Sequence, residues 1–157
     1  MSNAFPPPFD GPYEPSPSAW VREQVEAYES SGGSKANTLR DTGLPIIVVT
    51  MIGHSSAKVR KIALMRVTHD GEYALVASKG GAPEHPVWYS TLKHLPDVMI
   101  QDGPTPQRYT LREHDGAERQ EWWDRAVEAY PPYAEYQERA TSRTIPVLLA
   151  TPAGDDA

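Results

Sequence analysis

Residues 44–78 decide the fold, and they read LPIIVVTMIGHSSAKVRKIALMRVTHDGEYALVAS. Ile, Val and Leu dominate residues 44–52, and branched apolar side chains favour strands. Further strands are expected over 58–68 and 72–78, with Asp70-Gly71 between them as a typical hairpin dipeptide. The stretch therefore predicts three consecutive strands, the last two joined as a hairpin.

Helical patterns flank these strands. A helix is expected just after Pro17, because the apolar residues that follow recur at helical spacing. Further helices are expected over 86–95, over 118–130 and from Pro132, and further strands over 97–101, 107–112 and 144–150. Helices outside a mainly antiparallel sheet predict an α+β protein built on a small six-stranded barrel, closed or partly closed.

Composition excludes several classes of protein. The chain has 157 residues, enough for one domain with a sizeable core, and it has no cysteine. Disulfide scaffolds, thiolate metal sites and cysteine nucleophiles are therefore ruled out. The net charge of −6 argues against a nucleic-acid partner. The longest apolar run, 44–52, is far shorter than the roughly 20 residues of a membrane-spanning helix. We expect a cytoplasmic protein, with peripheral contact at the inner face of the membrane left open.

The N-terminal segment differs in composition from the rest of the chain. Residues 1–17 contain six of the 16 prolines and predict a flexible, extended arm. The alternative is a mobile flap that carries Phe5, Phe9 and Tyr13 toward a site. A single domain is expected over 18–152, followed by a short tail at 153–157.

A glycine-containing string marks the strongest candidate site. Ala77-Ser78-Lys79-Gly80-Gly81 follows a predicted strand and precedes a helix. The glycines allow the backbone to approach a ligand, and the lysine adds positive charge, so an anion site is one interpretation. An ordinary loop is the other, because P-loop spacing is missing. Lys58 and Arg60 lie two residues apart on a strand, so they point the same way and could serve the same anion or be ordinary surface charge.

Aromatic residues give a second candidate. Pro86-Val87-Trp88-Tyr89 could form the wall of a pocket for a flat cofactor or could be core. Tyr130, Tyr133 and Tyr136 have the same two interpretations, as substrate-side hydroxyls or as packing. The five histidines show no ligand spacing, so we expect no metal.

Together these residues resemble the deazaflavin-dependent nitroreductase and quinone reductase family of actinobacteria, which are split-β-barrel proteins that use coenzyme F420. The resemblance runs over about 44–150 and depends on 77–82, on Pro86-Val87-Trp88-Tyr89, and on the segment from Tyr130 to Pro146. The family's usual Gly-Arg-Lys-Thr-Gly is here Gly53-His54-Ser55-Ser56-Ala57, and Ala63 replaces a proline. The resemblance implies that two basic contacts to the tail of the cofactor are weakened, with compensation by Lys58 or Lys61 as the alternative.

The resemblance implies roles for individual residues. Lys79, Gly80 and Arg60 would hold the phosphate and acidic tail of the cofactor. The remaining expected cofactor-binding residues are Lys58, Ala77, Gly81 and, along the deazaflavin ring, Ser78, Pro86 and Trp88. The expected substrate-binding residues are Tyr130, Tyr133 and Tyr136, and the candidate proton donors are Tyr133, Tyr136, Ser78 and water.

Two functions of different class follow. The first is an F420H2-dependent oxidoreductase that passes hydride to an electron-poor acceptor such as a quinone, a nitro-aromatic compound or an activated enone. The second is a protein of the same fold that binds or carries F420 or a flavin without turnover. An FMN-using oxidase is less favoured, because the motifs are those of the deazaflavin branch. The sequence leaves the oligomeric state open.

Overall fold

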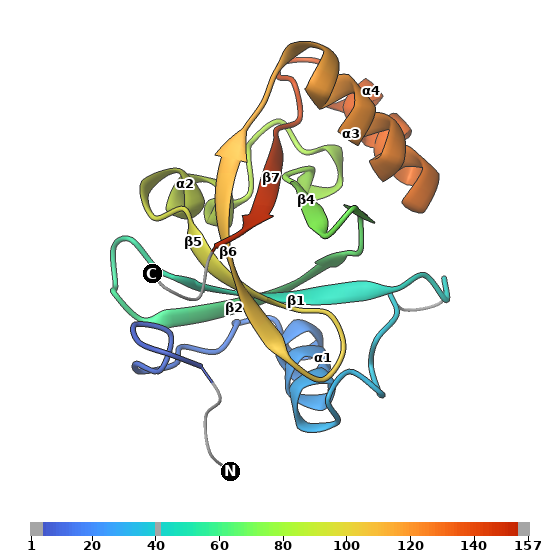
Figure 1. Ribbon diagram of the computed structural model, residues 1–157. Coiled ribbons are helices and arrows are strands. Elements are labelled where there is room, and N and C mark those ends of the chain that lie inside the picture. Colours follow the sequence, from blue (N-terminus) through green and yellow to red (C-terminus); the bar gives the residue numbers. More distant parts are fainter. Residues whose placement is uncertain (1–4, 40–41, 154–157) are drawn as a thin grey trace.

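Within the described residues, a seven-stranded antiparallel sheet forms the centre of the molecule (Figure 1). The computed structural model describes residues 5–39 and 42–153. Along the sheet the strand order is β2-β1-β5-β6-β7-β4-β3, and the sheet twists into a half-barrel (Figure 1). The strands are β1 (Ile46–Ile52), β2 (Val59–Met65), β3 (Thr68–His69), β4 (Glu72–Val76), β5 (Asp97–Gln101), β6 (Pro106–Glu113) and β7 (Val147–Pro152).

In the part of the chain that the structure describes, four α-helices pack around the sheet, in the order that the sequence predicts. They are α1 (Ala19–Ser30), α2 (Val87–His94), α3 (Gly116–Ala129) and α4 (Pro132–Arg139). Helices α3 and α4 lie together at one end of the molecule, far from α1 (Figure 1). Tyr130 lies in the break between α3 and α4, where Pro131 and Pro132 prevent one continuous helix.

The expected number of strands, six, is wrong by one. The predicted strand at 58–68 divides at Arg66-Val67 into β2 and β3. β2 pairs with β1 and β3 pairs with β4, so this single stretch of chain joins the two edges of the sheet. The sequence pattern predicts only an extended chain here. It does not show that the strand-pairing partner changes from β1 to β4, because that change depends on tertiary contacts rather than on the local pattern. The hairpin at Asp70-Gly71 is confirmed, and both residues have positive φ, as the tight turn requires.

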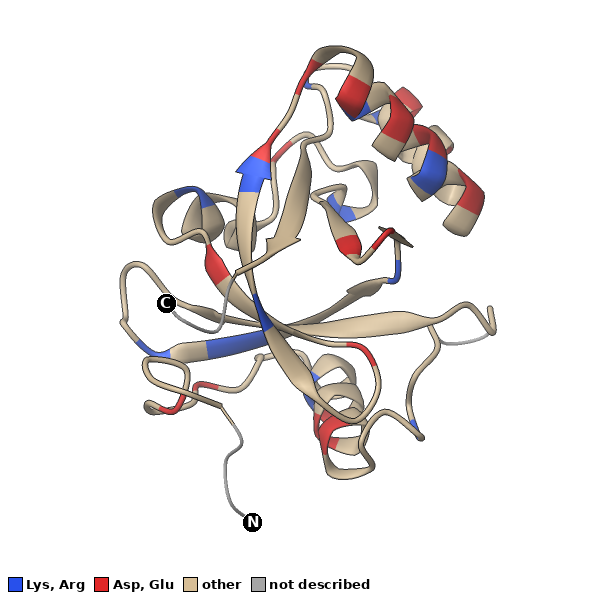
Figure 2. Cartoon of the chain, in the orientation of Figure 1, with Lys and Arg blue, Asp and Glu red and all other residues tan. Residues whose placement is uncertain are grey.

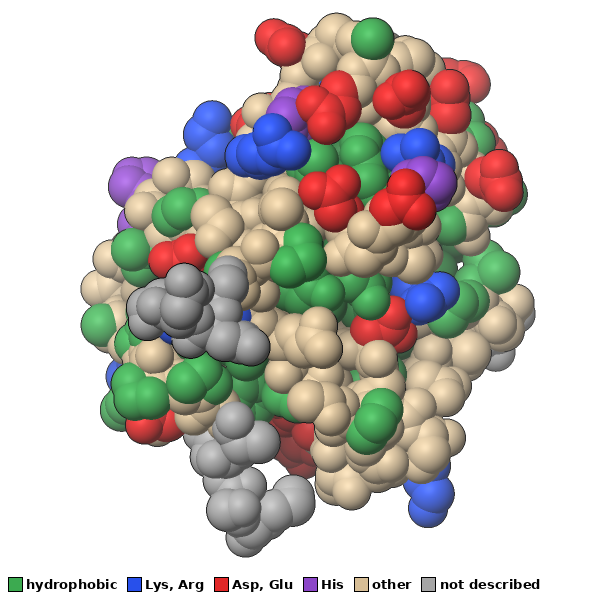
Figure 3. Space-filling model, viewed as in Figure 1, with side chains coloured by type: hydrophobic (Ala, Val, Ile, Leu, Met, Phe, Trp, Pro, Cys, Tyr) green, Lys and Arg blue, Asp and Glu red, His purple; other side chains and the backbone are tan. Residues whose placement is uncertain are grey.

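Apolar residues fill both faces of the sheet. Ile46 and Val48 pack with α1, α3 and α4, whereas Ile47 and Val49 pack with α2 and the strands around it. This explains why β1 is a continuous apolar run rather than an alternating one. Acidic side chains gather on the outside of α3 and α4 (Figures 2 and 3).

The N-terminal segment makes more contacts than its composition predicts. Val59 donates a backbone hydrogen bond to Pro12 (2.7 Å) and accepts one from Glu14 (2.9 Å), so the segment runs beside β2, an edge strand. Phe9 is only 1% exposed, with the Arg108 guanidinium over its ring. Residues 1–4 and 154–157, the start of the expected arm and nearly all of the expected tail, lie outside the described residues. Within the described part of the chain, no helix is long and apolar enough to cross a membrane.

Candidate functional site

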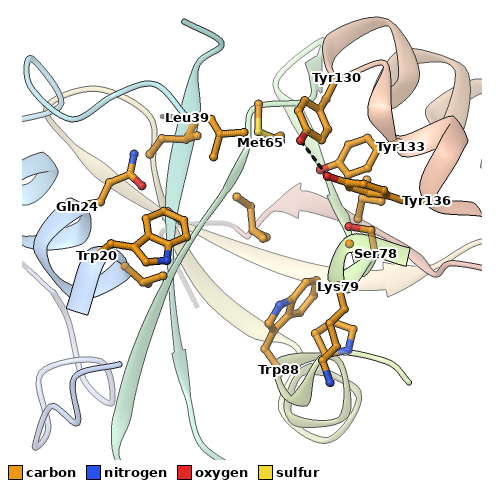
Figure 4. A pocket seen from close by; sticks show the side chains of 17 residues that line it. Trp20, Gln24, Leu39, Met65, Ser78, Lys79, Trp88, Tyr130, Tyr133 and Tyr136 are labelled. Carbon is orange, nitrogen blue, oxygen red and sulfur yellow. Dashed lines mark hydrogen bonds between the residues drawn. The ribbon is translucent and has the colours of Figure 1, made fainter. Parts of the chain in front are cut away.

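The larger of two adjoining cavities, which we call the tyrosine cavity, measures about 540 Å³. Trp20 and Gln24 of α1 line one side of it, and three tyrosines line the opposite side (Figure 4). Trp88 of α2 lies between them along the wall (Figure 4). Most of the lining is apolar, and the volume falls in the range of pockets for flat small molecules.

The tyrosines form one packed cluster despite the helix break. The ring centroids of Tyr130, Tyr133 and Tyr136 lie 4.9 to 6.1 Å apart. The Tyr130 and Tyr136 hydroxyls share a hydrogen bond of 3.0 Å (Figure 4). Tyr133 is 4% exposed. The sequence favoured Tyr133 and Tyr136 as the working pair, but the hydroxyls that meet are those of Tyr130 and Tyr136.

The Tyr130 and Tyr133 hydroxyls stay protonated at neutral pH. Burial, and secondarily the hydrogen bond to Tyr136, raises the pKa of Tyr130 to about 12. Burial also raises the pKa of Tyr133 above the ordinary value of a phenol. Tyr130 and Tyr133 can therefore donate hydrogen bonds to a bound molecule.

The glycine-containing loop lies on the floor of the same cavity. Ser78, Lys79 and Gly80 all line it, and Lys79 reaches Glu84 at 3.4 Å in an exposed ion pair. A short 3-10 turn spans Lys79–Gly81. Gly81 packs so tightly on α4 that an added Cβ would lie 2.8 Å from the carbonyl oxygen of Tyr136. No other residue fits there, which fixes the loop against the helix that carries the tyrosines.

A second cavity of about 390 Å³, which we call the arginine cavity, adjoins the first at Trp88. Arg60 and Lys61 of β2 line it, as do His54 and Thr91, which are hydrogen-bonded at 3.0 Å. This cavity has two cationic side chains among apolar ones, so together the two cavities suit a flat ring that carries an anionic extension.

Each lysine or arginine of the arginine cavity already has a carboxylate partner. Arg60 lies 3.6 Å from Glu14 of the N-terminal segment, which also lines the cavity. Lys61 binds Glu29 of α1, and the rings of Phe5 and Tyr13 cover its ammonium group. An incoming anion therefore meets cations that are partly neutralised.

Most of the predicted site residues meet at these cavities. Eight line the tyrosine cavity, and they are Ser78, Lys79, Gly80, Pro86, Trp88, Tyr130, Tyr133 and Tyr136. Arg60 lines only the arginine cavity. Lys58, Ala77 and Gly81 line neither of the two.

Comparison with known proteins agrees with this geometry. The model of the F420H(2)-dependent quinone reductase family matches residues 20–152. The chain belongs to that family. It is 34% identical over 110 residues to an F420H(2)-dependent quinone reductase of Mycobacterium tuberculosis. The aligned region covers 68% of this chain and 73% of the relative.

Solved structures show the same relationship. A structure described as an F420-H2 dependent reductase is 52% identical, has a TM-score of 0.65, and covers 68% of this chain and 94% of its own. A second, described as a domain-swapped dimer, is 47% identical with a TM-score of 0.67, and covers 87% and 100%. The heme storage protein of Vibrio cholerae, at 7% identity and a TM-score of 0.50, shares the fold alone. The fold is the split β-barrel of this family, and the chain is a member of a family of F420H2-dependent oxidoreductases.

Sequence reasoning missed residues that only the fold brings to the site. Trp20 and Gln24 line the tyrosine cavity from α1, and Glu14 enters the arginine cavity from the N-terminal segment. Arg143, in the segment between α4 and β7, belongs to the stretch that shows the family resemblance, but the resemblance assigns it no role; in the structure it bonds the glycine-containing loop. No local motif predicts these roles, because each residue acts on parts of the site that lie far from it in the sequence.

Proposed function

We propose that this chain transfers hydride from reduced coenzyme F420 to a small electron-poor acceptor, with a quinone as the first candidate. The observation that carries the proposal is the tyrosine cavity, where a glycine-containing loop with a lysine and a tryptophan wall face a hydrogen-bonded pair of phenols. The activity named for the relatives supports the same reaction.

The residues of both cavities fit the cofactor. Trp88 and Pro86 offer apolar walls for a flat ring, and Lys79 and the backbone of Gly80 lie where a phosphate could follow. Arg60 is the cation for the acidic tail beyond Trp88. When bound, a reduced deazaflavin supplies hydride and resists one-electron chemistry.

The protein itself orients the acceptor, excludes water and supplies a proton. The acceptor would bind between the Trp88 wall and the tyrosines, which would hold it in one orientation. Hydride and one proton together reduce a quinone to a hydroquinone. The Tyr130–Tyr136 hydroxyl pair can stabilise the negative charge that develops on the acceptor oxygen, and Tyr133, Tyr136, Ser78 or water can deliver the proton.

The test is turnover with purified protein, reduced F420 and menadione. We expect the absorbance of oxidised F420 to return at a rate that depends on the protein. Reduced F420 that binds but is never oxidised would instead favour the second function, a carrier of the cofactor. A cytoplasmic location, with contact at the inner face of the membrane left open, remains a prediction that cell fractionation checks.

A further inference from the structure

The loop at Ala77–Ala82 holds an unusual backbone. Lys79, Gly80 and Gly81 have φ values of 46°, 63° and 84°, so three consecutive residues are left-handed. Lys79 has a Cβ and is disfavoured in that conformation. Such a conformation persists only where the surrounding structure holds it. The contacts that hold this loop therefore decide whether its lysine and backbone face a ligand.

One side chain, that of Arg143, makes three hydrogen bonds to this loop. The Arg143 guanidinium donates from Nε to the Ala82 carbonyl (3.0 Å), and from Nη1 to the Ala77 carbonyl (3.1 Å). Nη2 donates to the Ser78 carbonyl at 2.8 Å. Nη1 also meets Nδ1 of His85 at 2.9 Å. The planar guanidinium thus bonds four acceptors, and three of them are carbonyls that lie before and after the left-handed turn. Arg143 therefore fixes the backbone on both sides of the turn.

We propose that Arg143 is a positioning residue that holds the Ala77–Ala82 loop in its cofactor-binding conformation and fixes it relative to the tyrosines of α4; this inference rests on the proposed function. Arg143 is not among the residues that line either cavity, so it acts through the loop rather than on a ligand. Gly81 lies directly against the backbone of Tyr136, and Arg139 donates to the Gly80 carbonyl at 3.4 Å. Loop and helix thus form one unit that Arg143 fastens.

Lysine cannot replace this arginine fully. An ammonium group is a single point of donation, whereas Arg143 donates from three separate nitrogens of one planar group. We expect Arg143→Gln to raise the dissociation constant of F420 at least tenfold, and Arg143→Lys to raise it less. Arg112→Gln is the matched control, because Arg112 forms a surface pair with Glu118 at 3.9 Å and lines neither cavity.

His85 gives the proposal a signature in pH. Its Nδ1 can accept from Arg143 only while the ring is neutral, and partial burial and then Arg143 lower its pKa. The other groups that face it are Tyr89 and Lys93 of α2 and Glu113 of β6. As the pH falls below about 6.5, the ordinary value for histidine, the ring begins to gain a proton and lose this bond. F420 affinity should fall with it.

The His85→Asn variant distinguishes protonation of His85 from a general loss of structure at low pH. The Asn Oδ1 can accept from Arg143 in place of the imidazole Nδ1, yet it does not titrate. We expect the dissociation constant of the wild-type protein to rise between about pH 7.5 and pH 5.5, and that of His85→Asn to stay nearly flat. Equal slopes in the two proteins would overturn the role of His85.

Amide hydrogen exchange over residues 79–82 tests Arg143 without the cofactor. Faster exchange in Arg143→Gln, with exchange in α1 and β1 unchanged, is the expected result. Unchanged exchange together with F420 binding within twofold of wild type would overturn the proposal. If Arg143→Gln does not fold, the Arg143→Lys and His85→Asn comparisons decide. A wild-type protein that fails to bind F420 would contradict the proposed function, while the exchange data would still judge Arg143.

Discussion

The two cavities that meet at Trp88 differ in the side chains that line them and in the kind of group that each can bind. The tyrosine cavity is mainly apolar, and on the side that α4 covers its polar groups are neutral hydroxyls, of which those of Tyr130 and Tyr136 are hydrogen-bonded to each other. The arginine cavity adds charged side chains to an apolar lining, and its lysine and arginine are already paired with carboxylates of the same chain. The first can order and polarise a reacting molecule, whereas the second can recognise charge without paying for a bare buried cation.

This contrast predicts that variants in the two cavities change different measured quantities. Rate should depend on the tyrosine cavity, and salt-dependent affinity on the loop and the arginine cavity. The predictions below run from the largest expected effect to the smallest, and each one tests that division.

Removal of the Tyr136 hydroxyl should have the largest effect. Tyr136→Phe keeps the ring but breaks the bond to Tyr130, so acceptor reduction should slow by about 10²-fold while F420 affinity stays nearly constant. Steady-state kinetics with menadione measures it. The control is Tyr89→Phe, whose hydroxyl binds Glu113 away from both cavities. A drop under about threefold would mean that the rings only shape the cavity.

Loss of the Phe9 ring should have the next largest effect, on stability. Composition alone predicts that the N-terminal arm is dispensable for folding, but the burial of Phe9 changes that expectation. Phe9→Ala should lower the free energy of unfolding by about 3 kcal/mol, as for other buried phenylalanines. Urea denaturation measures the change. An unchanged midpoint would return the arm to its predicted role as a flexible terminus.

Removal of the Lys79 ammonium should weaken cofactor binding about tenfold. The expected size follows from a charge-assisted hydrogen bond, worth roughly 1.5–3 kcal/mol. Binding of F420 by the wild-type protein should also weaken as salt is added, and Lys79→Ala should flatten that dependence. Lys93→Ala is the control, since this exposed lysine pairs with Glu113 and lines neither cavity. Equal affinities for Lys79→Ala and wild type would remove Lys79 from the anion site.

Removal of the Glu14 carboxylate should have the smallest effect, and in the opposite direction. Glu14→Gln frees Arg60 from its partner, so F420 should bind about two- to fivefold more tightly, the range expected for an exposed ion pair. Titration at low salt measures it, with Glu26→Gln on α1 as the control. Weaker binding in Glu14→Gln would show that the carboxylate helps to shape the cavity instead of competing with the tail.

The success and failure of sequence reasoning have physical causes. The apolar run of β1 and the Asp70-Gly71 turn are local signals, and both are found where they are predicted. The division of the second strand at Arg66-Val67 is not local, because Arg66 turns toward Asp102 on the β5–β6 hairpin while the chain changes its pairing partner.

The site divides in the same way. Ser78, Lys79 and Trp88 belong to adjacent strings, so pattern and resemblance locate them, and all three line the tyrosine cavity. Arg143 lies more than 60 residues from the carbonyls that it binds, and Glu14 reaches Arg60 only because its segment runs beside β2. Side chains that act across such separations become visible only in the folded chain.

The backbone bonds between the N-terminal segment and β2 have a consequence for handling the protein. β2 is an outer strand of the sheet, and the segment covers its free backbone groups near Val59. An uncovered outer strand is a template on which further chains can add by strand pairing. Trimming the first 15 residues to ease crystallisation would therefore expose a self-complementary edge, and concentrated samples of the trimmed chain would associate and precipitate sooner than the full-length protein.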